Sequence, residues 1–172
     1  KENDPIRLFY ELNKEDATAF YALNPQGIVV TRMPGREGAI GADYSDKPEF
    51  QYVSKYLKPY LSEIFKASSG KYAVSVTVPA IKDDKLVGAL RWLIESDVIY
   101  KKFIEHENQG GREVWIVDND GEIISHPISY HIGNDFLKIH KVKHPDIDWS
   151  SLERIMDDIK EGRTGTGMYD YH

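Results

Sequence analysis

Short apolar runs alternate with polar turns through the first half of the chain. Phe20–Leu23 and Ile28–Arg32 are two such runs, and Asn24-Pro25-Gln26-Gly27 between them predicts a hairpin in which glycine supplies a positive φ. Three longer β-rich runs follow, separated by Ser/Gly and Asp/Asp turn sequences. They are residues 59–68, 71–81 and 85–96. The pattern predicts an antiparallel sheet made of a hairpin and a three-stranded meander.

Four other segments place apolar residues at helical spacing. They are residues 5–15, 45–58, 97–109 and 149–162. For the second helix we expect Ser45 or Asp46 as the N-cap, and for the fourth we expect Ser150 and Glu153 to form a capping box. The remaining expectations are a hairpin at 113–126, a polar loop at 127–148 and a short strand at 167–171.

The segment 20–46 recurs in outline at 114–135. Each copy has an apolar run, a polar turn closed by glycine, a β-branched run, a proline and a second glycine. Gly27 and Gly121 are 94 residues apart, which is long enough for a small α/β lobe. The second copy has no counterpart of the last two strands of the first. The sequence therefore predicts an α+β chain with one complete lobe and the front part of a second, similar lobe.

Composition narrows the possible functions of this chain of 172 residues. Its net charge of −6, without clustered Lys and Arg, argues against a nucleic-acid partner. The absence of cysteine excludes disulfides, thiolate catalysis and cysteine-type zinc sites. No apolar run reaches the roughly 18–20 residues that cross a bilayer. Because the chain starts at Lys1 without a methionine, we expect it to be an excised piece, from which flanking membrane segments could have been removed.

Motifs for catalysis and calcium binding are missing. The sequence has no Gly-x-Ser-x-Gly elbow, P-loop or dinucleotide-binding glycine pattern, so we expect no catalytic activity and no cofactor. Asp118-x-Asp120-Gly121 is similar to the start of a calcium loop, but Ser129 stands where that loop requires glutamate.

Four histidines in the second half admit a zinc site as an alternative. They are His126, His131, His140 and His144, of which the last two have helical i, i+4 spacing. Pro145 disfavours a helix at this point, and no further ligand is evident. We therefore expect a solvated or pH-responsive loop, without a metal.

The order of these elements resembles the double Cache domain, the PAS-like extracellular sensor region of membrane histidine kinases and chemoreceptors. In the first lobe the resemblance rests on Asn24-Pro25-Gln26-Gly27, Gly41-x-Asp43-x-Ser45-x-x-Pro48, Val78-Pro79-Ala80 and Leu86-Val87-Gly88. In the second it rests on Val117-Asp118-Asn119-Asp120-Gly121, His126-Pro127, Ile132-Gly133 and Gly165-Thr166-Gly167.

The resemblance implies a domain organisation and a role. Residues 1–16 would be the C-terminal remnant of a preceding helix, 17–96 the complete membrane-distal lobe, 97–111 a connecting helix and 112–172 a truncated membrane-proximal lobe. The distal lobe of the family usually holds a small ligand. The resemblance further implies an extracellular or periplasmic location, a homodimer through the preceding helix, and a receptor as the parent, with a histidine kinase favoured.

Candidate ligand-binding residues cluster first in the loop and helix that follow the hairpin. They are Asp43, Tyr44, Lys47, Phe50 and Tyr52, which combine aromatic area with charge and hydroxyl groups. The amino-acid-binding members of the family have Arg-x-Trp-Tyr in this helix, where this chain has Lys47-Pro48-Glu49-Phe50. The alternative for Phe50 is helix packing, and for Lys47 a solvated position.

Arg91 is the most informative candidate on the strands. Strand alternation places it among apolar neighbours in mid-sheet, where a guanidinium is rarely left unpaired. The family's amino-acid binders have an Asp where this chain has Leu93, so the resemblance implies a ligand with a carboxylate and without an ammonium group. The alternative is an internal salt bridge, with Asp43 as the candidate partner.

Four further residues complete the candidate site. Ser75 and Thr77 share a strand face, while Tyr60 and Ser62 match a family position that faces the pocket. The sequence thus predicts an extracellular ligand-sensing region. The alternative is a structural or protein-interaction module whose pocket has collapsed.

Overall fold

The computed structural model describes residues 5–108 and 110–169 and divides the chain into two compact units. The first unit comprises Lys1–Ser62 and Ala73–Val98. The second comprises Glu63–Tyr72 and Ile99–His172. Residues 63–72 belong to the second unit, although strands of the first unit precede and follow them in the sequence. The lobe boundaries expected from the sequence stay a prediction.

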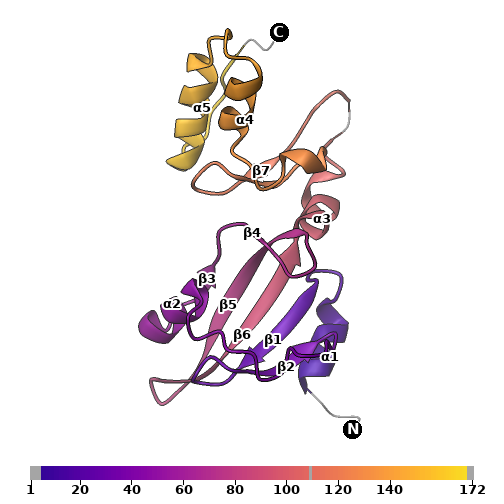
Figure 1. The fold of residues 1–172 in the computed structure, drawn as a ribbon, viewed down its shortest axis with the longest axis vertical. Helices are drawn as coiled ribbons and strands as arrows, with labels where there is room; N and C mark the ends of the chain where they lie inside the picture. The colour runs from indigo at the N-terminus through magenta and orange to yellow at the C-terminus, as the bar shows by residue number, and fades with distance from the viewer. Residues whose placement is uncertain (1–4, 109, 170–172) are drawn as a thin grey trace. The chain divides into compact units, whose positions relative to one another are not determined.

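The first unit is built on an antiparallel sheet with the order β2-β1-β6-β5-β3 (Figure 1). Its strands are β1 (Ala19–Leu23), β2 (Val29–Met33), β3 (Tyr60–Leu61), β5 (Tyr72–Lys82) and β6 (Lys85–Glu95). The predicted hairpin and the two long meander strands are confirmed. The predicted strand at 59–68 is only partly correct, because it divides into two short strands, β3 and β4 (Phe65–Lys66).

Two helices cover opposite faces of this sheet. Helix α1 (Pro5–Asn13) stacks Phe9 on Trp92, with 5.7 Å between ring centroids. Helix α2 (Pro48–Tyr56) contacts the other face, where its Glu49 meets Arg91. Adjacent strand residues point to opposite faces, so the two contacts place α1 and α2 on opposite sides, as Figure 1 shows. The expected N-cap of α2 is wrong: Lys47 occupies that position and makes no side-chain cap bond.

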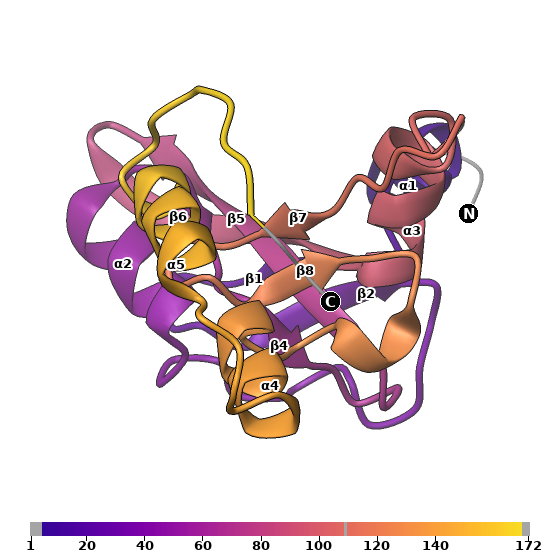
Figure 2. The same cartoon turned by 90° about the horizontal axis from the view of Figure 1, so that it is seen from above.

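The second unit contains a small hairpin and several helices. Its strands are β7 (Ile116–Val117) and β8 (Ile123–Ser125). Its helical segments are the end of α3 (Ser96–Ile99), a π-helix (Tyr100–Ile104), a 3-10 helix (Ser129–His131), α4 (Phe136–Lys143) and α5 (Ser150–Lys160). Helices α4 and α5 lie side by side (Figure 2), joined by an ion pair between Lys141 and Glu153.

Four sequence expectations for this part of the chain differ from the structure. The expected loop at 127–148 contains α4, because Asp135 caps this helix and Pro145 lies beyond its last residue. The expected capping box is absent, because Trp149 is the N-cap of α5. The helix expected at 97–109 ends as a π-helix at Ile104. Of the strand expected at 167–171, residues 170–171 lie outside the described residues and 167–169 form no strand.

The sequence repeat is a structural repeat of one turn. In the first copy the side chain of Asn24 accepts hydrogen bonds from the backbone N–H groups of Gln26 and Ile28, at 3.0 and 2.9 Å. In the second copy Asp118 accepts from the residues 94 positions further on, Asp120 and Glu122, at 3.0 and 2.9 Å. The glycines that close the two turns have φ values of 85° and 86°. An Asx residue and a left-handed glycine thus build the same turn in both units.

Candidate functional site

One row of side chains crosses the whole first-unit sheet on the face covered by α2. Directly paired residues of neighbouring strands share a face. The row consists of Arg32, Tyr21, Arg91, Thr77 and Tyr60. It contains three of the residues that the sequence selected as ligand-binding candidates: Arg91, Thr77 and Tyr60.

Arg91 lies at the centre of this row and is 4 % exposed. Its Nε donates a hydrogen bond to Oε1 of Glu49, at 3.1 Å. The guanidinium also lies over the rings of Tyr21 and Tyr44, 5.4 Å from each centroid. Burial raises the pKa of Tyr44 above its ordinary value, and the positive charge of Arg91 opposes that rise. The site is therefore a buried cation held between one carboxylate and two aromatic rings.

The internal salt bridge considered from the sequence exists, with a different partner. Glu49 is the partner of Arg91, whereas Asp43 is exposed and accepts a hydrogen bond from the backbone N–H of Ser45, at 2.8 Å. Hydrogen bonding to the side chain of Ser45 and, second, to its backbone N–H lowers the pKa of the Asp43 carboxyl. Asp43 as the partner is thus wrong, because its carboxylate is used within its own turn.

Two hydroxyl groups beside Arg91 are buried without a hydrogen-bond partner. Ser75 Oγ and Thr77 Oγ1 belong to side chains that are 0 % exposed, and neither has a partner among the described residues. Thr77 pairs directly with Arg91 across β5 and β6, and Ser75 lies two residues away on the same face. The backbone N–H of Ser75 is satisfied by Ser62 Oγ at 2.8 Å. The hydroxyls are therefore unused hydrogen-bonding capacity next to a buried cation.

A cluster of tyrosines lies between α2 and β3. The ring of Tyr52 is 4.9 Å from that of Tyr60 and 4.7 Å from that of Tyr56. Phe50 is buried and its ring contacts the turn at Gly27. These aromatic residues pack α2 against the sheet.

Lys47, like Asp43, is a predicted site residue that the structure leaves exposed to solvent. Its side chain is 49 % exposed, and its ammonium lies 3.9 Å from a carboxylate oxygen of Asp46. The structure therefore brings together Tyr44, Ser75, Thr77 and Arg91, and joins Tyr52 to Tyr60, but it does not turn Lys47 or Asp43 towards Arg91.

Sequence reasoning missed Glu49, Tyr21 and Arg32. Arg32 Nε donates to the hydroxyl of Tyr21 at 3.2 Å, which orients that ring beneath Arg91. A signal for Glu49 was present, because it lies four residues before the buried Val53 and therefore on the same face of α2. A glutamate in a first helical turn is common in solvent, so helical spacing alone does not predict its burial.

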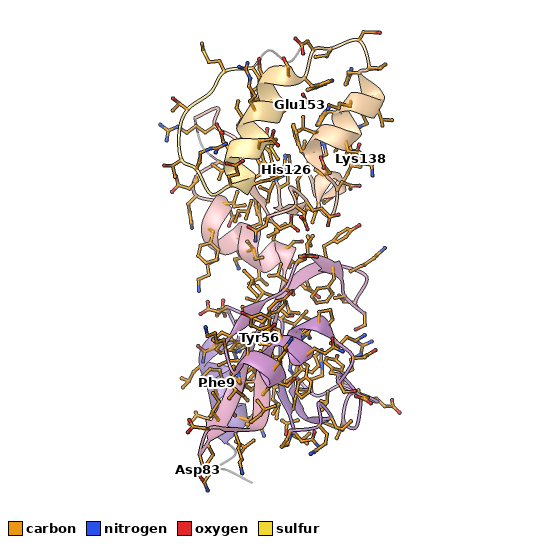
Figure 3. The ribbon with its side chains drawn as sticks, turned by 90° about the vertical axis from the view of Figure 1, so that its left-hand side faces the viewer. Phe9, Tyr56, Asp83, His126, Lys138 and Glu153 are labelled. Atoms are coloured by element: carbon orange, nitrogen blue, oxygen red, sulfur yellow. The ribbon has the colours of Figure 1, made fainter. Side chains whose placement is uncertain are left out.

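The sequence predicted a solvated or pH-responsive loop for the histidines of the second unit, and its solvated form is wrong for three of the four. His126, His131 and His140 are buried, and His144 is exposed. In Figure 3 His126 lies inside the unit whose helices carry the labelled Lys138 (α4) and Glu153 (α5). Among residues 5–108 and 110–169, no group of three or more His, Asp or Glu side chains is arranged to hold a metal ion.

A hollow of about 470 Å³ opens on the surface of the second unit. Its lining carries both signs of charge, with Glu122 and Asp135 opposite Lys138 and Lys143. None of the predicted ligand-binding residues belongs to it.

The comparisons with known proteins give structural neighbours only. No protein-family model and no curated protein matches the chain. Among solved structures, an extracellular ligand binding receptor from Desulfohalobium retbaense DSM5692 has a TM-score of 0.67 at 18 % identity, over 83 % of this chain and 27 % of its own. The periplasmic sensory domain of the Campylobacter jejuni chemoreceptor Tlp1 has a TM-score of 0.65 at 17 % identity, over 98 % and 69 %.

A third neighbour is the ligand-binding domain of the Pseudomonas aeruginosa amino acid chemoreceptor PctC in complex with GABA. Its TM-score is 0.62 at 15 % identity, over 76 % of this chain and 59 % of that one. The chain thus spans about a quarter of the first neighbour's length and about six tenths of the third's. These neighbours confirm the predicted fold class: the chain has the PAS-like α+β fold of extracellular sensory domains. None of the described helices is long and apolar enough to cross a membrane.

Proposed function

We propose that this chain is the extracellular or periplasmic ligand-sensing region of a transmembrane signalling receptor. The first unit binds a small molecule between its sheet and α2, and the chain itself catalyses no reaction. The parent is a sensor histidine kinase or a chemoreceptor. The fold shared with chemoreceptor sensory domains supports this role.

The observation that carries the proposal is the buried Arg91 with two partnerless hydroxyls beside it. A buried hydroxyl without a hydrogen bond costs about 1–3 kcal/mol, so Ser75 and Thr77 are unfavourable unless something else binds them. A ligand with acceptor oxygens would satisfy both groups. The combination is typical of a site for a small polar molecule, in which a few aimed groups are surrounded by aromatic rings.

The ion pair with Glu49 indicates how binding would be transmitted. A ligand carboxylate would compete with Glu49 for the guanidinium of Arg91. Glu49 lies in the first turn of α2, so its displacement would change how α2 packs on β6. A ligand that prefers the displaced arrangement would shift the equilibrium towards it.

The alternative is a structural or protein-interaction module. The Arg91–Glu49 pair and the Tyr52–Tyr60 contact favour it, because both fill the space that a ligand would need. In that case the first unit would bind no small molecule.

A thermal-shift screen against small carboxylates, amino acids, polyamines and purines tests the proposal. We expect a carboxylate to raise the midpoint of unfolding of the first unit in a concentration-dependent way. Thr77→Val and Arg91→Lys should each weaken the apparent affinity for this carboxylate at least tenfold, since each alters one group that contacts the ligand. The midpoint shift at a given concentration should be smaller in both variants.

Lys47→Ala is the matched control, because it removes an exposed charge beside the same helix. We expect it to bind the same compound with affinity within about threefold of the unchanged chain. A screen without any hit, or a hit unaffected by Thr77→Val and Arg91→Lys, would favour the interaction module.

A further inference from the structure

The three buried histidines of the second unit form one continuous cluster. They come from different segments: His126 follows β8, His131 ends the 3-10 helix and His140 lies on α4. Their exposed fractions are 3 %, 9 % and 6 %. The rings of His126 and His131 are 4.5 Å apart between centroids, and those of His131 and His140 are 5.5 Å apart. Any charge on one ring is therefore close to the other two.

Aromatic rings surround the cluster. Trp115 lies 6.2 Å from His126, Phe136 lies 4.2 Å from His140, and Trp149 lies 5.9 Å from His140 between ring centroids. These rings replace water, which would otherwise solvate an imidazolium. The neutral forms of the histidines are thus the ones that fit the packed unit.

Hydrogen bonds determine where the hydrogens of the neutral pair lie. The backbone N–H of Ile128 donates to Nδ1 of His126 at 2.9 Å, so the ring hydrogen of His126 must be on Nε2. That Nε2 lies 3.3 Å from Nδ1 of His131 and 2.9 Å from Oε1 of Glu113. Nδ1 of His131 therefore faces a donor and carries no hydrogen.

A further proton cannot enter this pair without breaking a hydrogen bond. At Nδ1 of His126 it would face the N–H of Ile128, and at Nδ1 of His131 it would face the N–H of His126. Two donors that face each other repel. Protonation and the packed arrangement are therefore mutually exclusive at both of these atoms.

Most of the charged groups around the cluster disfavour protonation of its histidines. Lys143 on α4 is close enough to His131 and His140 to disfavour a second positive charge, and His144 at the end of α4 does the same for His140. Glu113, before β7, opposes them at His126 and His131, but its side chain is 57 % exposed. Glu153 on α5 is bound to Lys141. Burial is the largest influence, and it lowers the pKa of all three histidines below the ordinary value of 6.5.

We propose that the second unit is a proton-binding element: acidification charges the cluster of His126, His131 and His140 and opens the packing of β8, the 3-10 helix and α4. The open form binds more protons than the packed one. The packed form is therefore fully favoured above the ordinary histidine pKa of 6.5, and it loses stability as the pH falls below that value.

Proton binding by the histidine cluster does not involve the residues of the Arg91 site. None of the six histidines of the chain lies in the first unit, which comprises residues 1–62 and 73–98. A change of pH between 7 and 5.5 therefore acts on histidines of the second unit. The protein would combine a small-molecule signal with a proton signal.

The test is an NMR titration of the chain of residues 1–172 from pH 8 to pH 5. Histidine ring C–H signals report protonation, and the indole N–H signals of Trp115 and Trp149 report the packing of the cluster. Trp92 is a built-in control in the first unit. We expect the cluster histidines to titrate below 6.5, and the Trp115 and Trp149 signals to change over the same range while that of Trp92 does not.

Amide hydrogen exchange measures how far acidification shifts the opening equilibrium of the second unit. Each proton linked to opening changes the opening equilibrium about tenfold per pH unit, so at least tenfold more opening is expected in the second unit between pH 7 and pH 5.5, after correction for intrinsic exchange. In His126→Asn the amide oxygen still accepts from Ile128 but cannot titrate. Combined with His131→Asn it should flatten the profile, whereas His106→Gln, which alters an exposed histidine, should not.

The proposal is overturned if the cluster histidines titrate at the ordinary value without any change at Trp115 and Trp149. It is equally overturned if the double asparagine variant keeps the unaltered pH profile. Should that variant fail to fold, the titration of the unaltered chain decides alone.

Discussion

Ser75 and Ser62 are the same residue type, but only one of their hydroxyls takes part in a hydrogen bond within the protein. Ser62 Oγ accepts a hydrogen bond from the backbone N–H of Ser75, and Ser75 Oγ has no partner among the described residues. Thr77 Oγ1 shares the situation of Ser75 Oγ. A hydroxyl buried without a hydrogen bond destabilises the fold, whereas one that accepts a bond stabilises it, so removing each hydroxyl in turn distinguishes the two cases.

Thr77→Val should raise the free energy of unfolding by about 1–3 kcal/mol, because the replacement keeps the shape and removes a hydroxyl that is buried without a hydrogen bond. Ser62→Ala is the matched comparison and should cost about 1–3 kcal/mol, since it leaves the N–H of Ser75 buried and unpaired. Urea unfolding of each variant measures both. A costly Thr77→Val would mean that its hydroxyl has a structural partner.

Gly27 combines a positive φ with close contacts. A Cβ there would lie 2.9 Å from Cε1 of Phe50 and 2.9 Å from the backbone Cα of Ser45, whereas one at Gly38 would meet nothing within 4 Å. Both residues have positive φ, at 85° and 71°. The two positions therefore separate the cost of backbone conformation from the cost of crowding.

We expect Gly38→Ala to cost about 1–2 kcal/mol, which is the penalty of a left-handed alanine. Gly27→Ala should cost that amount plus about 1–3 kcal/mol, because Phe50 and the backbone of Ser45 must move apart. Denaturation curves of the two variants give the difference. Equal costs would show that the turn relaxes without disturbing Phe50.

At the scale of elements, the pattern of apolar and polar residues predicted the features that depend on residues close together in the sequence. Both Asx–glycine turns were visible in the sequence because Asn24 and Asp118 accept hydrogen bonds from backbone N–H groups no more than four residues away. The face of Arg91 followed from strand alternation. Its partner Glu49 lies 42 residues away, and no spacing rule connects a residue of α2 to one of β6.

Helix α4 was missed for a related reason. Its eight residues include one histidine and three lysines, so its apolar stripe is short and its burial depends on the rings of the histidine cluster. The histidines were predicted to be solvated because histidine is usually polar and exposed. Their burial depends on aromatic residues from other segments, such as Trp115 and Trp149, which residue type alone does not reveal. Tertiary contacts, rather than local preference, decide such segments.

The Arg91–Glu49 pair joins α2 to β6, and a double-mutant cycle measures that connection. Glu49→Leu and Arg91→Met alone should each cost about 3–5 kcal/mol, because each removes one partner of a buried ion pair. The double variant should cost much less than the sum, since it buries no charge. Urea unfolding supplies the four free energies, and additive costs would contradict a direct coupling between the two side chains.

At the scale of the whole molecule, the two units divide the chemistry between them. The first has a buried cation, aromatic rings and unused hydroxyls, and no histidine. The second has a buried histidine cluster and the repeated turn on a smaller two-stranded sheet. The same turn is thus accompanied by different buried side chains in the two units. This difference would suit the two proposed signals, a small molecule in the first unit and protons in the second.

The path of residues 63–72 has a consequence for dissecting the protein. The chain passes between the units after Ser62, after Tyr72 and after Val98, so no single peptide bond separates them. A polypeptide truncated at Val98 would retain Glu63–Tyr72 without the rest of the second unit, and its Ile64 and Ala67, now 9 % and 8 % exposed, would become accessible to water. Gene fusions and domain exchanges in this protein therefore have to transfer both units together, or replace residues 63–71 with a short polar turn.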